Sequence, residues 1–281
     1  MAIFYDTHAH LDDERFAGDL PEVIERANAA GITRINCIAT DLEGSRRAIE
    51  LAERYPNVFA VVGWHPSHAM EAPEDIRPAL RELARHPKVV ALGETGLDYY
   101  RLPSKGKTSS SPPNEGREEI ALDDERHKTK QAELFRQHLE VAAEMGLGVV
   151  IHERESMQDL LTQLQPFSVR VRGVFHCFAG DATAMKRVLA MGSLVSFTGI
   201  LTFKNGQNIR DALAATPMGK FMLETDSPYL APVPYRGKRC EPAYVKEIAE
   251  VASQVKGCTL EELSETTCEA ARGFFFQKVK N

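Results

Sequence analysis

The stretch FYDTHAH (4–10) places an aspartate and two histidines at alternate positions directly after an apolar run. On a β-strand, successive side chains point to opposite faces, so Asp6, His8 and His10 would project together. Three polar side chains on one buried face are costly unless something binds them. By itself, the stretch therefore indicates a candidate metal site and nothing more specific.

Further histidines and carboxylates follow other apolar runs of the chain. They stand at or just beyond the C-terminal ends of β-rich runs: His65, Glu94, His152, His176, Glu224 and Asp226. One histidine at a strand end is usually a hydrogen-bonded structural residue. Histidines and carboxylates at the C-terminal ends of several strands indicate instead that these residues form one site. The other histidines fall on expected loops or helices, and we expect surface residues without chemistry at His68, His86, His127 and His138.

The elements that must position these residues are eight β-rich runs, which alternate with longer amphipathic stretches. The runs cover residues 2–8, 33–40, 58–65, 88–94, 147–152, 171–176, 192–197 and 220–225. Strands that are apolar on both sides predict an α/β fold of the (β/α)8 TIM barrel type, in which the C-terminal strand ends build the active site. An open doubly wound sheet is the alternative, but GxGxxG and GxxxxGK[ST] are both absent. We expect residues 1–281 to form a single domain, with extra C-terminal helices over 259–276.

The segment LPSKGKTSSSPPNEGREEIALDDERHK (102–128) interrupts this alternation. Its serines, prolines and mixed charges favour a mobile loop over packed structure. The segment leaves the fourth strand at the end where the site is expected. Two interpretations stay open, a lid or substrate-specificity loop and a tolerated disordered insertion.

The strand-end residues offer imidazole nitrogens and carboxylate oxygens, which suit Zn²⁺, Mn²⁺ or Mg²⁺. The expected metal ligands are His8, His10, Glu94, His152, His176 and Asp226. They exceed what one catalytic ion uses, so we expect two divalent ions with Glu94 as the bridge. Asp226 would bind one ion and act as general base toward the attacking water. We expect Asp6 and Glu224 to support and orient the ligands without binding metal themselves.

The composition is that of an ordinary globular protein. The 281 residues are 43% hydrophobic and 26% charged, and no run approaches the roughly 18 apolar residues of a membrane span. The five cysteines are scattered without a CxxC, and the chain starts without a secretory signal, so we expect a cytoplasmic protein with reduced thiols. The net charge of −6 argues against a broad basic surface that coats duplex nucleic acid.

Seven motifs together resemble the TatD-type metal-dependent deoxyribonucleases, in family order: DTHAH (6–10), GWHP (63–66), GETGLDYY (93–100), VVIHER (149–154), FHCFAG (175–180), ETDSPYLAP (224–232) and RGKRCEP (236–242). The resemblance implies cleavage of DNA phosphodiester bonds, as a 3′–5′ exonuclease on single strands, with Mg²⁺ or Mn²⁺ and sometimes Zn²⁺ in the site. It implies the same six ligands and a phosphate contact for His65. Cys240 departs from the asparagine usual at its position, and the 102–128 insertion is longer than typical.

Substrate contacts and a competing function follow from the same residues. Arg154 and Arg236 lie just after the fifth and eighth strands and could contact neighbouring phosphates, although each is as readily a solvated loop charge. The competing function keeps the metals and changes the bond, to a cyclic amide, lactone, phosphotriester or aminoacyl ester. Many such enzymes bridge their metals with a modified lysine on the fourth strand, where this chain has Glu94 and carries Lys88 at the wrong end.

Overall fold

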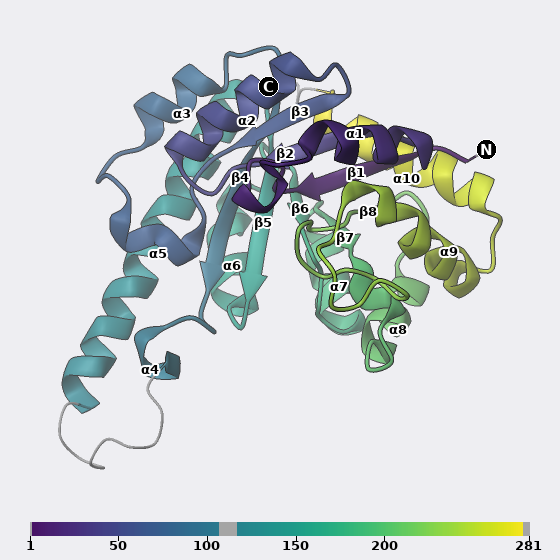
Figure 1. Ribbon diagram of the computed structural model, residues 1–281. Helices are drawn as coiled ribbons and strands as arrows, with labels where there is room; N and C mark the ends of the chain where they lie inside the picture. The colour runs from purple at the N-terminus through teal and green to yellow at the C-terminus, as the bar shows by residue number, and fades with distance from the viewer. Residues whose placement is uncertain (1, 107–116, 278–281) are drawn as a thin grey trace.

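A computed structural model describes residues 2–106 and 117–277, and all eight predicted strands are present in it (Figure 1). They form one parallel sheet in the order β1-β2-β3-β4-β5-β6-β7-β8. The strands are β1 (Phe4–Ala9), β2 (Ile32–Ile38), β3 (Val58–Val62), β4 (Val89–Asp98), β5 (Gly148–Arg154), β6 (Gly173–Phe175), β7 (Leu194–Phe197) and β8 (Phe221–Leu223). The prediction of an eight-stranded α/β barrel is confirmed.

The sheet closes on itself through the segment that follows β8. Ala9 and Ser227 form a parallel bridge, and the His10 amide donates to the Ser227 carbonyl at 2.7 Å. The Asp226 amide donates to the carbonyl of His8 at 2.9 Å. The seam between the first and last strands is therefore made by residues at the C-terminal end of the barrel, where the site was expected.

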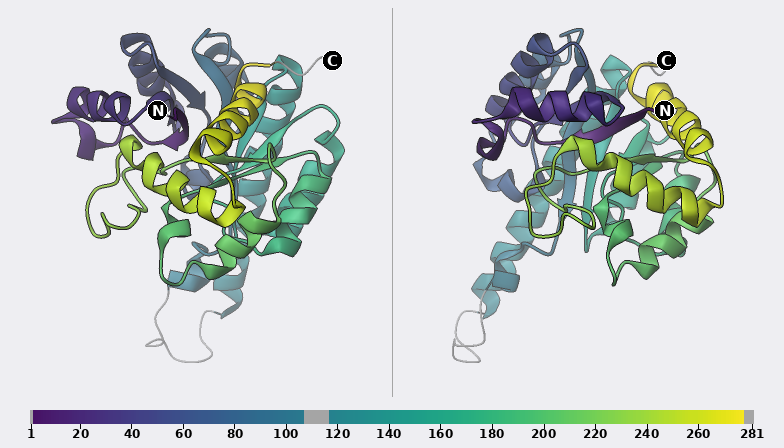
Figure 2. Two further views of the ribbon diagram at one scale, coloured as in Figure 1. Left: turned by 90° about the vertical axis from the view of Figure 1, so that its right-hand side faces the viewer. Right: turned by 45° about the vertical axis from the view of Figure 1, so that its right-hand side comes forward.

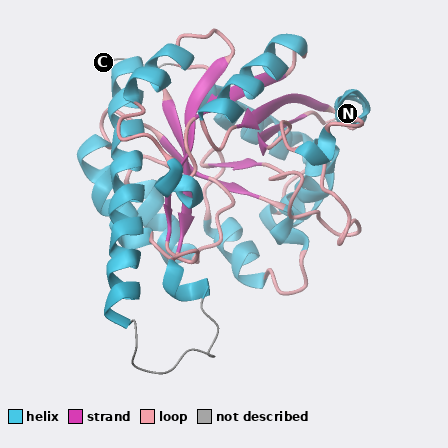
Figure 3. Cartoon of the chain, turned by 60° about the vertical axis from the view of Figure 1, so that its left-hand side comes forward, coloured by secondary structure: helices cyan, strands magenta, loops and turns pink. Residues whose placement is uncertain are grey.

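Helices surround the strands and bury their apolar faces against them (Figure 3). They are α1 (Leu20–Ala29), α2 (Leu42–Arg54), α3 (Arg77–Leu83), α4 (Pro103–Gly106), α5 (Arg117–Met145), α6 (Met157–Leu164), α7 (Ala182–Ala190), α8 (Gln207–Ala215), α9 (Val245–Lys256) and α10 (Leu260–Phe275). Several begin at a side-chain cap that the sequence supplies. The Asp41 carboxylate accepts from Gly44 N at 2.6 Å, and Thr259 and Glu262 form a reciprocal capping box at the start of α10.

Helix α10 closes the end of the barrel opposite the site, beside α9 (Figure 2). Its Phe274 and Phe275 cluster with interior strand residues such as Tyr5 and Val150. A Cβ on Gly148, the first residue of β5, would lie 2.6 Å from the Phe274 ring. This close approach leaves no room for a side chain at Gly148. The extra helices predicted over 259–276 are one helix, α10, which covers this end of the barrel.

The expected loop over 102–128 is only partly a loop. Residues Pro103–Gly106 form α4, and from Arg117 onward the chain is already in α5, whose first turns project beyond the barrel (Figure 1). Residues 107–116, with the serines and prolines on which the prediction depended, lie outside the described residues. The rest of the segment is rich in helix-forming charged residues, and Lys128 pairs with Glu125 at 2.7 Å on the α5 surface.

Among the described residues, none of the helices combines the length and the apolar character needed to cross a membrane.

Candidate metal centre

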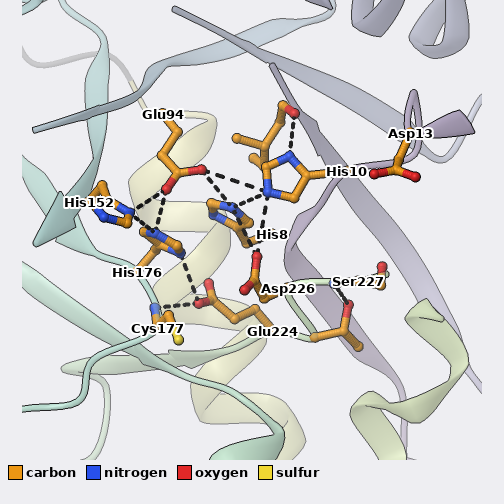
Figure 4. A network of polar contacts seen from close by, with 12 residues as sticks. His8, His10, Asp13, Glu94, His152, His176, Cys177, Glu224, Asp226 and Ser227 are labelled. Atoms are coloured by element: carbon orange, nitrogen blue, oxygen red, sulfur yellow. Dashed lines mark hydrogen bonds and ion pairs between the residues drawn. The ribbon is translucent and has the colours of Figure 1, made fainter. Parts of the chain in front are cut away.

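The expected ligands converge at the C-terminal mouth of the barrel (Figure 4). Each stands on or just after a different part of the strand ring: His8 and His10 on and after β1, Glu94 in β4, His152 in β5, His176 after β6 and Asp226 after β8. His8 and Glu94 are buried, and the Asp226 and His10 side chains keep a small exposed edge toward the mouth. The parallel strands thus bring residues from positions 8 to 226 into one cluster.

Glu94 lies at the centre of this cluster and divides it in two. Its Oε2 is 3.4 Å from His8 Nε2 and 3.7 Å from His10 Nε2. Its Oε1 is 2.7 Å from His176 Nε2 and 2.8 Å from His152 Nδ1. We call the first group, completed by Asp226, the β1–β8 half, and the second the β5–β6 half.

The β1–β8 half contains two imidazoles and a carboxylate. His8 Nε2 and His10 Nε2 lie 3.4 Å apart, and Asp226 Oδ1 is 3.7 Å from the first and 3.5 Å from the second. His10 Nδ1 is held by the Ile38 carbonyl at 2.9 Å, so its Nε2 is the atom directed into the cluster. One donor atom of each of these three residues lies within 4.8 Å of the others, which is close enough to share an ion.

Electrostatics keep the two carboxylates ionised in spite of their burial. Burial would raise the pKa of Glu94, but the charges of His176 and His65 and hydrogen bonds to His152 and His176 hold it well below its usual value. Burial likewise opposes ionisation of Asp226, but its hydrogen bond to His10 and the nearby imidazoles lower its pKa. Both residues therefore present anionic oxygens to whatever occupies the centre.

Asp6 and Glu224 contact the loop and strand ends that carry the ligands. Asp6 Oδ1 accepts from Thr225 N at 2.9 Å, and its Oδ2 lies 2.6 Å from Thr225 Oγ1, one residue before Asp226. Burial raises the pKa of Asp6 to about 8. Glu224 accepts from Cys177 N at 2.6 Å and from Ser196 Oγ at 2.7 Å, with His176 Nδ1 3.6 Å away. The structure thus places both carboxyl groups behind the cluster.

Asp98, which was not predicted from the sequence, contacts the expected ligand His152 directly. Its buried Oδ2 lies 3.2 Å from His152 Nε2, on the side of the imidazole opposite Glu94. The hydrogen bond and charge of His152 outweigh burial and lower the pKa of Asp98. A carboxylate behind a histidine fixes its tautomer and makes it a stronger metal ligand. The alternation that groups Asp6, His8 and His10 also groups Glu94 and Asp98, and it could have found this residue.

The centre lies in a pocket of about 830 Å³ at the barrel mouth. His65, expected to contact phosphate, is inside it, with Nε2 3.2 Å from Glu94 Oε1 and 3.3 Å from His152 Nδ1. Arg154 also lines the pocket, with its guanidinium 3.7 Å from the centre of the Tyr100 ring. Arg236 is not brought into the pocket, because it is exposed and packs over Phe203 at 3.8 Å.

Two further residues are buried in the structure. Cys240, which stands where the resemblance expects asparagine, is buried behind the mouth, where its amide donates to the Pro228 carbonyl at 3.1 Å. His138 was expected on the surface, but it is fully buried on the face of α5 that packs on β4 and on the segment after β3. That face also carries Leu134 and Phe135, so the helical period of three and four residues was the available signal.

The residues present fit divalent ions. The facing nitrogens of His8 and His10, and of His152 and His176, would repel one another as lone pairs unless a cation or proton lies between them. Anionic oxygens of Glu94 and Asp226 face the same space. Lys88 cannot bridge the metals, because it lies directly before β4, at the end of the strand away from the centre. Its ammonium group donates to the Pro56 carbonyl at 2.8 Å.

An eight-stranded barrel with a histidine–carboxylate cluster at its strand ends defines the class of metal-dependent hydrolases. Residues 5–276 match the family described as TatD-related DNase. The chain is 37% identical to the metal-dependent hydrolase YabD of Bacillus subtilis, over 97% of this chain and 99% of YabD. It is 31% identical to the 3′-5′ ssDNA/RNA exonuclease TatD of Erwinia tasmaniensis, over 96% of this chain and 99% of the relative. The chain therefore belongs to the TatD-related DNase family.

Solved structures agree with this assignment. The crystal structure of YjjV, a TatD homologue from Escherichia coli K12, superposes with a TM-score of 0.83 at 26% identity and covers 97% of both chains. The phosphotriesterase homology protein of Escherichia coli, at a TM-score of 0.63 and 14% identity, shares the fold.

Proposed function

We propose that the protein is a divalent-metal-dependent phosphodiesterase that removes nucleotides from the 3′ ends of single-stranded DNA. The observation that carries the proposal is the position of Glu94, whose two oxygens face two separate groups of ligands. Such a carboxylate suits two ions a short distance apart, the arrangement that stabilises both the attacking and the leaving oxygen in phosphoryl transfer. The six ligands are His8, His10, Glu94, His152, His176 and Asp226.

Bound divalent ions would neutralise the phosphoryl oxygens and favour ionisation of water near neutral pH. Asp226 would be the general base, because its lowered pKa keeps the carboxylate unprotonated and its partly exposed side chain faces the pocket. Glu94 would hold both halves of the centre in register. His65 would donate a hydrogen bond to the substrate phosphate while neutral, since burial and the neighbouring imidazoles of His152 and His176 lower its pKa to about 4.

The pocket suits a short stretch of single strand. Its volume of about 830 Å³ falls within the range of small-ligand sites, and its rim carries Arg154, Arg101 and the half-exposed ring of Tyr229. An aromatic ring can stack on a base, and an arginine can pair with a phosphate next to the one that is cleaved. With a net charge of −6, the chain favours gripping a strand end over tracking a duplex. The name of the Erwinia tasmaniensis relative agrees with this substrate.

The test is to strip the protein of metal and incubate it with end-labelled single- and double-stranded oligonucleotides, adding Mg²⁺, Mn²⁺ or Zn²⁺. The proposal expects metal-dependent loss of nucleotides from the 3′ end of single strands, and loss of this activity in Asp226→Ala. Cleavage by the variant at the wild-type rate would contradict the role of Asp226.

A 5′ label and a 3′ label on the same strand distinguish the polarity of degradation. Arg154→Ala should raise KM for the oligonucleotide and leave kcat nearly unchanged, and Arg236→Ala, outside the pocket, is its matched control. If no metal restores cleavage and a lactone, cyclic amide or phosphotriester is hydrolysed instead, the nuclease proposal is wrong.

A further inference from the structure

The buried His138 of α5 joins β4 to the segment after β3 at the level where the metal centre begins. The backbone pairing of β3 with β4 runs through Val61 with Ala91 and Val62 with Leu92 and then stops. Beyond that level lie Glu94, in β4, and His65, in the segment that follows β3. The buried His138 side chain reaches both segments from α5.

Two contacts of His138 are with residues next to His65 and Glu94. Its Nε2 accepts from Trp64 N at 3.0 Å, directly before His65. Its Nδ1 lies 3.1 Å from Thr95 Oγ1, directly after Glu94, and 2.7 Å from the Leu134 carbonyl of its own helix. The imidazole thus links the segment after β3 to β4, while the backbone amides of His65 and Glu94 donate to the Thr40 and Ala39 carbonyls.

These contacts require one tautomer. A backbone N–H can only donate, so Nε2 must carry the lone pair that accepts from Trp64. The Leu134 carbonyl can only accept, so Nδ1 must carry the proton. The ring is therefore neutral, and its burial among apolar residues, which lowers the pKa of His138 to about 4, agrees with this assignment.

The packing around the ring leaves it little freedom. A Cβ on Gly63 would lie 2.8 Å from His138 Nε2 and 2.6 Å from the Gly93 carbonyl oxygen, so only glycine lets the imidazole approach the Trp64 amide. The adjacent Gln137 is also buried and accepts from Ile76 N at 2.8 Å, but it serves a loop away from the centre. This neighbour offers a matched control, because its loss also leaves a backbone amide without its side-chain acceptor.

We propose that His138 is a positioning residue for Glu94, a metal ligand, and for His65, which faces the substrate phosphate, and that it acts through the Thr95 hydroxyl and the Trp64 amide. The inference rests on the proposed function for the roles of these two side chains. His138 does not touch the centre itself. Its contribution is to hold the segments that carry Glu94 and His65 together beyond the level where β3 and β4 pair with each other.

The test compares His138→Leu with His138→Gln, whose side-chain oxygen can reach the Trp64 amide from nearly the same place as Nε2. Mn²⁺ affinity is measured by calorimetric titration of metal-free protein. We expect His138→Leu to weaken binding about 10-fold or more, as for other residues behind metal ligands, and His138→Gln to recover most of the loss. Gln137→Leu should lower the melting temperature and leave Mn²⁺ affinity at the wild-type value.

A second readout does not need metal. Trp64 is the sole tryptophan of the 281-residue chain and is nearly buried, so its fluorescence reports the segment that His138 holds. We expect acrylamide quenching to rise in His138→Leu, and to stay close to wild type in His138→Gln and Gln137→Leu. Wild-type Mn²⁺ affinity and quenching in His138→Leu would overturn the proposal, as would equal weakening of affinity in Gln137→Leu.

If His138→Leu does not fold, the wild-type protein still decides the question. Nitrogen NMR of the imidazole should show Nδ1 protonated and Nε2 unprotonated, with a Trp64 amide that is strongly protected from exchange. The opposite tautomer or a rapidly exchanging amide would overturn the proposal. These measurements involve no substrate, so a failure to cleave nucleic acid would contradict the proposed function without deciding the role of His138.

Discussion

The two halves of the metal centre are both held by backbone pairing, and they differ in the carboxyl groups behind their ligands. In the β1–β8 half, Asp226 N donates to the His8 carbonyl and His10 N to the Ser227 carbonyl, and the carboxyl group behind them, that of Asp6, has a raised pKa. In the β5–β6 half, His152 pairs with Gly96 and His176 N donates to the Ile151 carbonyl at 3.0 Å, and the pKa of the carboxyl group behind His152 is lowered. Asp98 supports His152, and Gln131 of α5 pairs with the backbone of Asp98 in turn. Substitutions of supporting polar residues should therefore be more damaging in the second half.

The largest effect should come from Glu94→Gln, because the two carboxylate oxygens of Glu94 face the two halves. The amide keeps the size of the side chain but removes its charge and one acceptor. We expect metal binding to weaken in both halves and kcat to fall by about 10³-fold or more, which corresponds to the several kcal/mol that metal ions contribute to such reactions. Metal analysis and single-turnover cleavage measure the two effects. Loss confined to one half would contradict a bridging role.

Asp98→Asn should damage the β5–β6 half alone. The lowered pKa of Asp98 makes it an anion behind His152, and asparagine cannot supply that charge. We expect the affinity for the ion bound by His152 to fall by about 10- to 100-fold, with the other binding step unchanged. Mn²⁺ titration followed by paramagnetic resonance separates the two binding steps. Equal weakening of both steps would show that the halves are not independent.

The pH dependence of the free energy of unfolding tests the burial of His138, which contacts the neighbours of His65 and Glu94. Burial lowers the pKa of His138 from its ordinary value of 6.5 to about 4. Between these values the unfolded chain binds a proton that the folded chain does not, so the free energy of unfolding falls as the pH drops, by up to about 1.4 kcal/mol per pH unit. The contribution is complete above 6.5 and lost toward 4.

In His138→Gln this group is absent, so the acid side of the stability profile should be shallower than in the wild type. Urea denaturation of metal-free protein at several pH values measures the slopes. Because His65 titrates in both proteins, the difference between them isolates His138. Parallel profiles would contradict the lowered pKa of His138.

The smallest effect should come from Asp6→Asn in the first half. Burial raises the pKa of Asp6 to about 8, so its carboxyl group is mostly neutral at pH 7, and asparagine is its neutral counterpart. The amide can still accept from Thr225 N and donate to Thr225 Oγ1. We expect metal affinity at pH 7 within about threefold of wild type, or less than about 0.7 kcal/mol. A loss as large as that in Asp98→Asn would remove the contrast between the halves.

Most of the fold could be predicted from the sequence, because each strand is a short apolar run and each helix a stretch with apolar residues every three or four positions. The end of β4 could not be predicted so readily. The apolar run stops near Glu94, but the strand continues to Asp98 through Gly96, which pairs with His152 in β5. A glycine in a strand gives no hydrophobic signal, so the last residues of β4 resemble a loop in sequence.

The candidate site could be predicted where a residue type is itself unusual on a strand, as with His8, His10 and His176. It could not be predicted where the role depends on what lies behind the strand. Histidine occurs both on surfaces and in cores, so only the packing of α5 against β4 and the segment after β3 shows that His138 is buried. In the same way, Arg154 and Arg236 are alike in sequence, and the loops alone decide that the first lines the pocket.

The proposed function requires one chain to bind two divalent ions that share Glu94. Titration of metal-free wild-type protein with Mn²⁺, with paramagnetic resonance recorded at each step, tests this requirement. We expect two equivalents bound per chain and a spin-coupled spectrum at saturation, which needs ions close enough to share a ligand. A single equivalent, or two equivalents with the spectrum of isolated ions, would show that Glu94 does not bridge two ions.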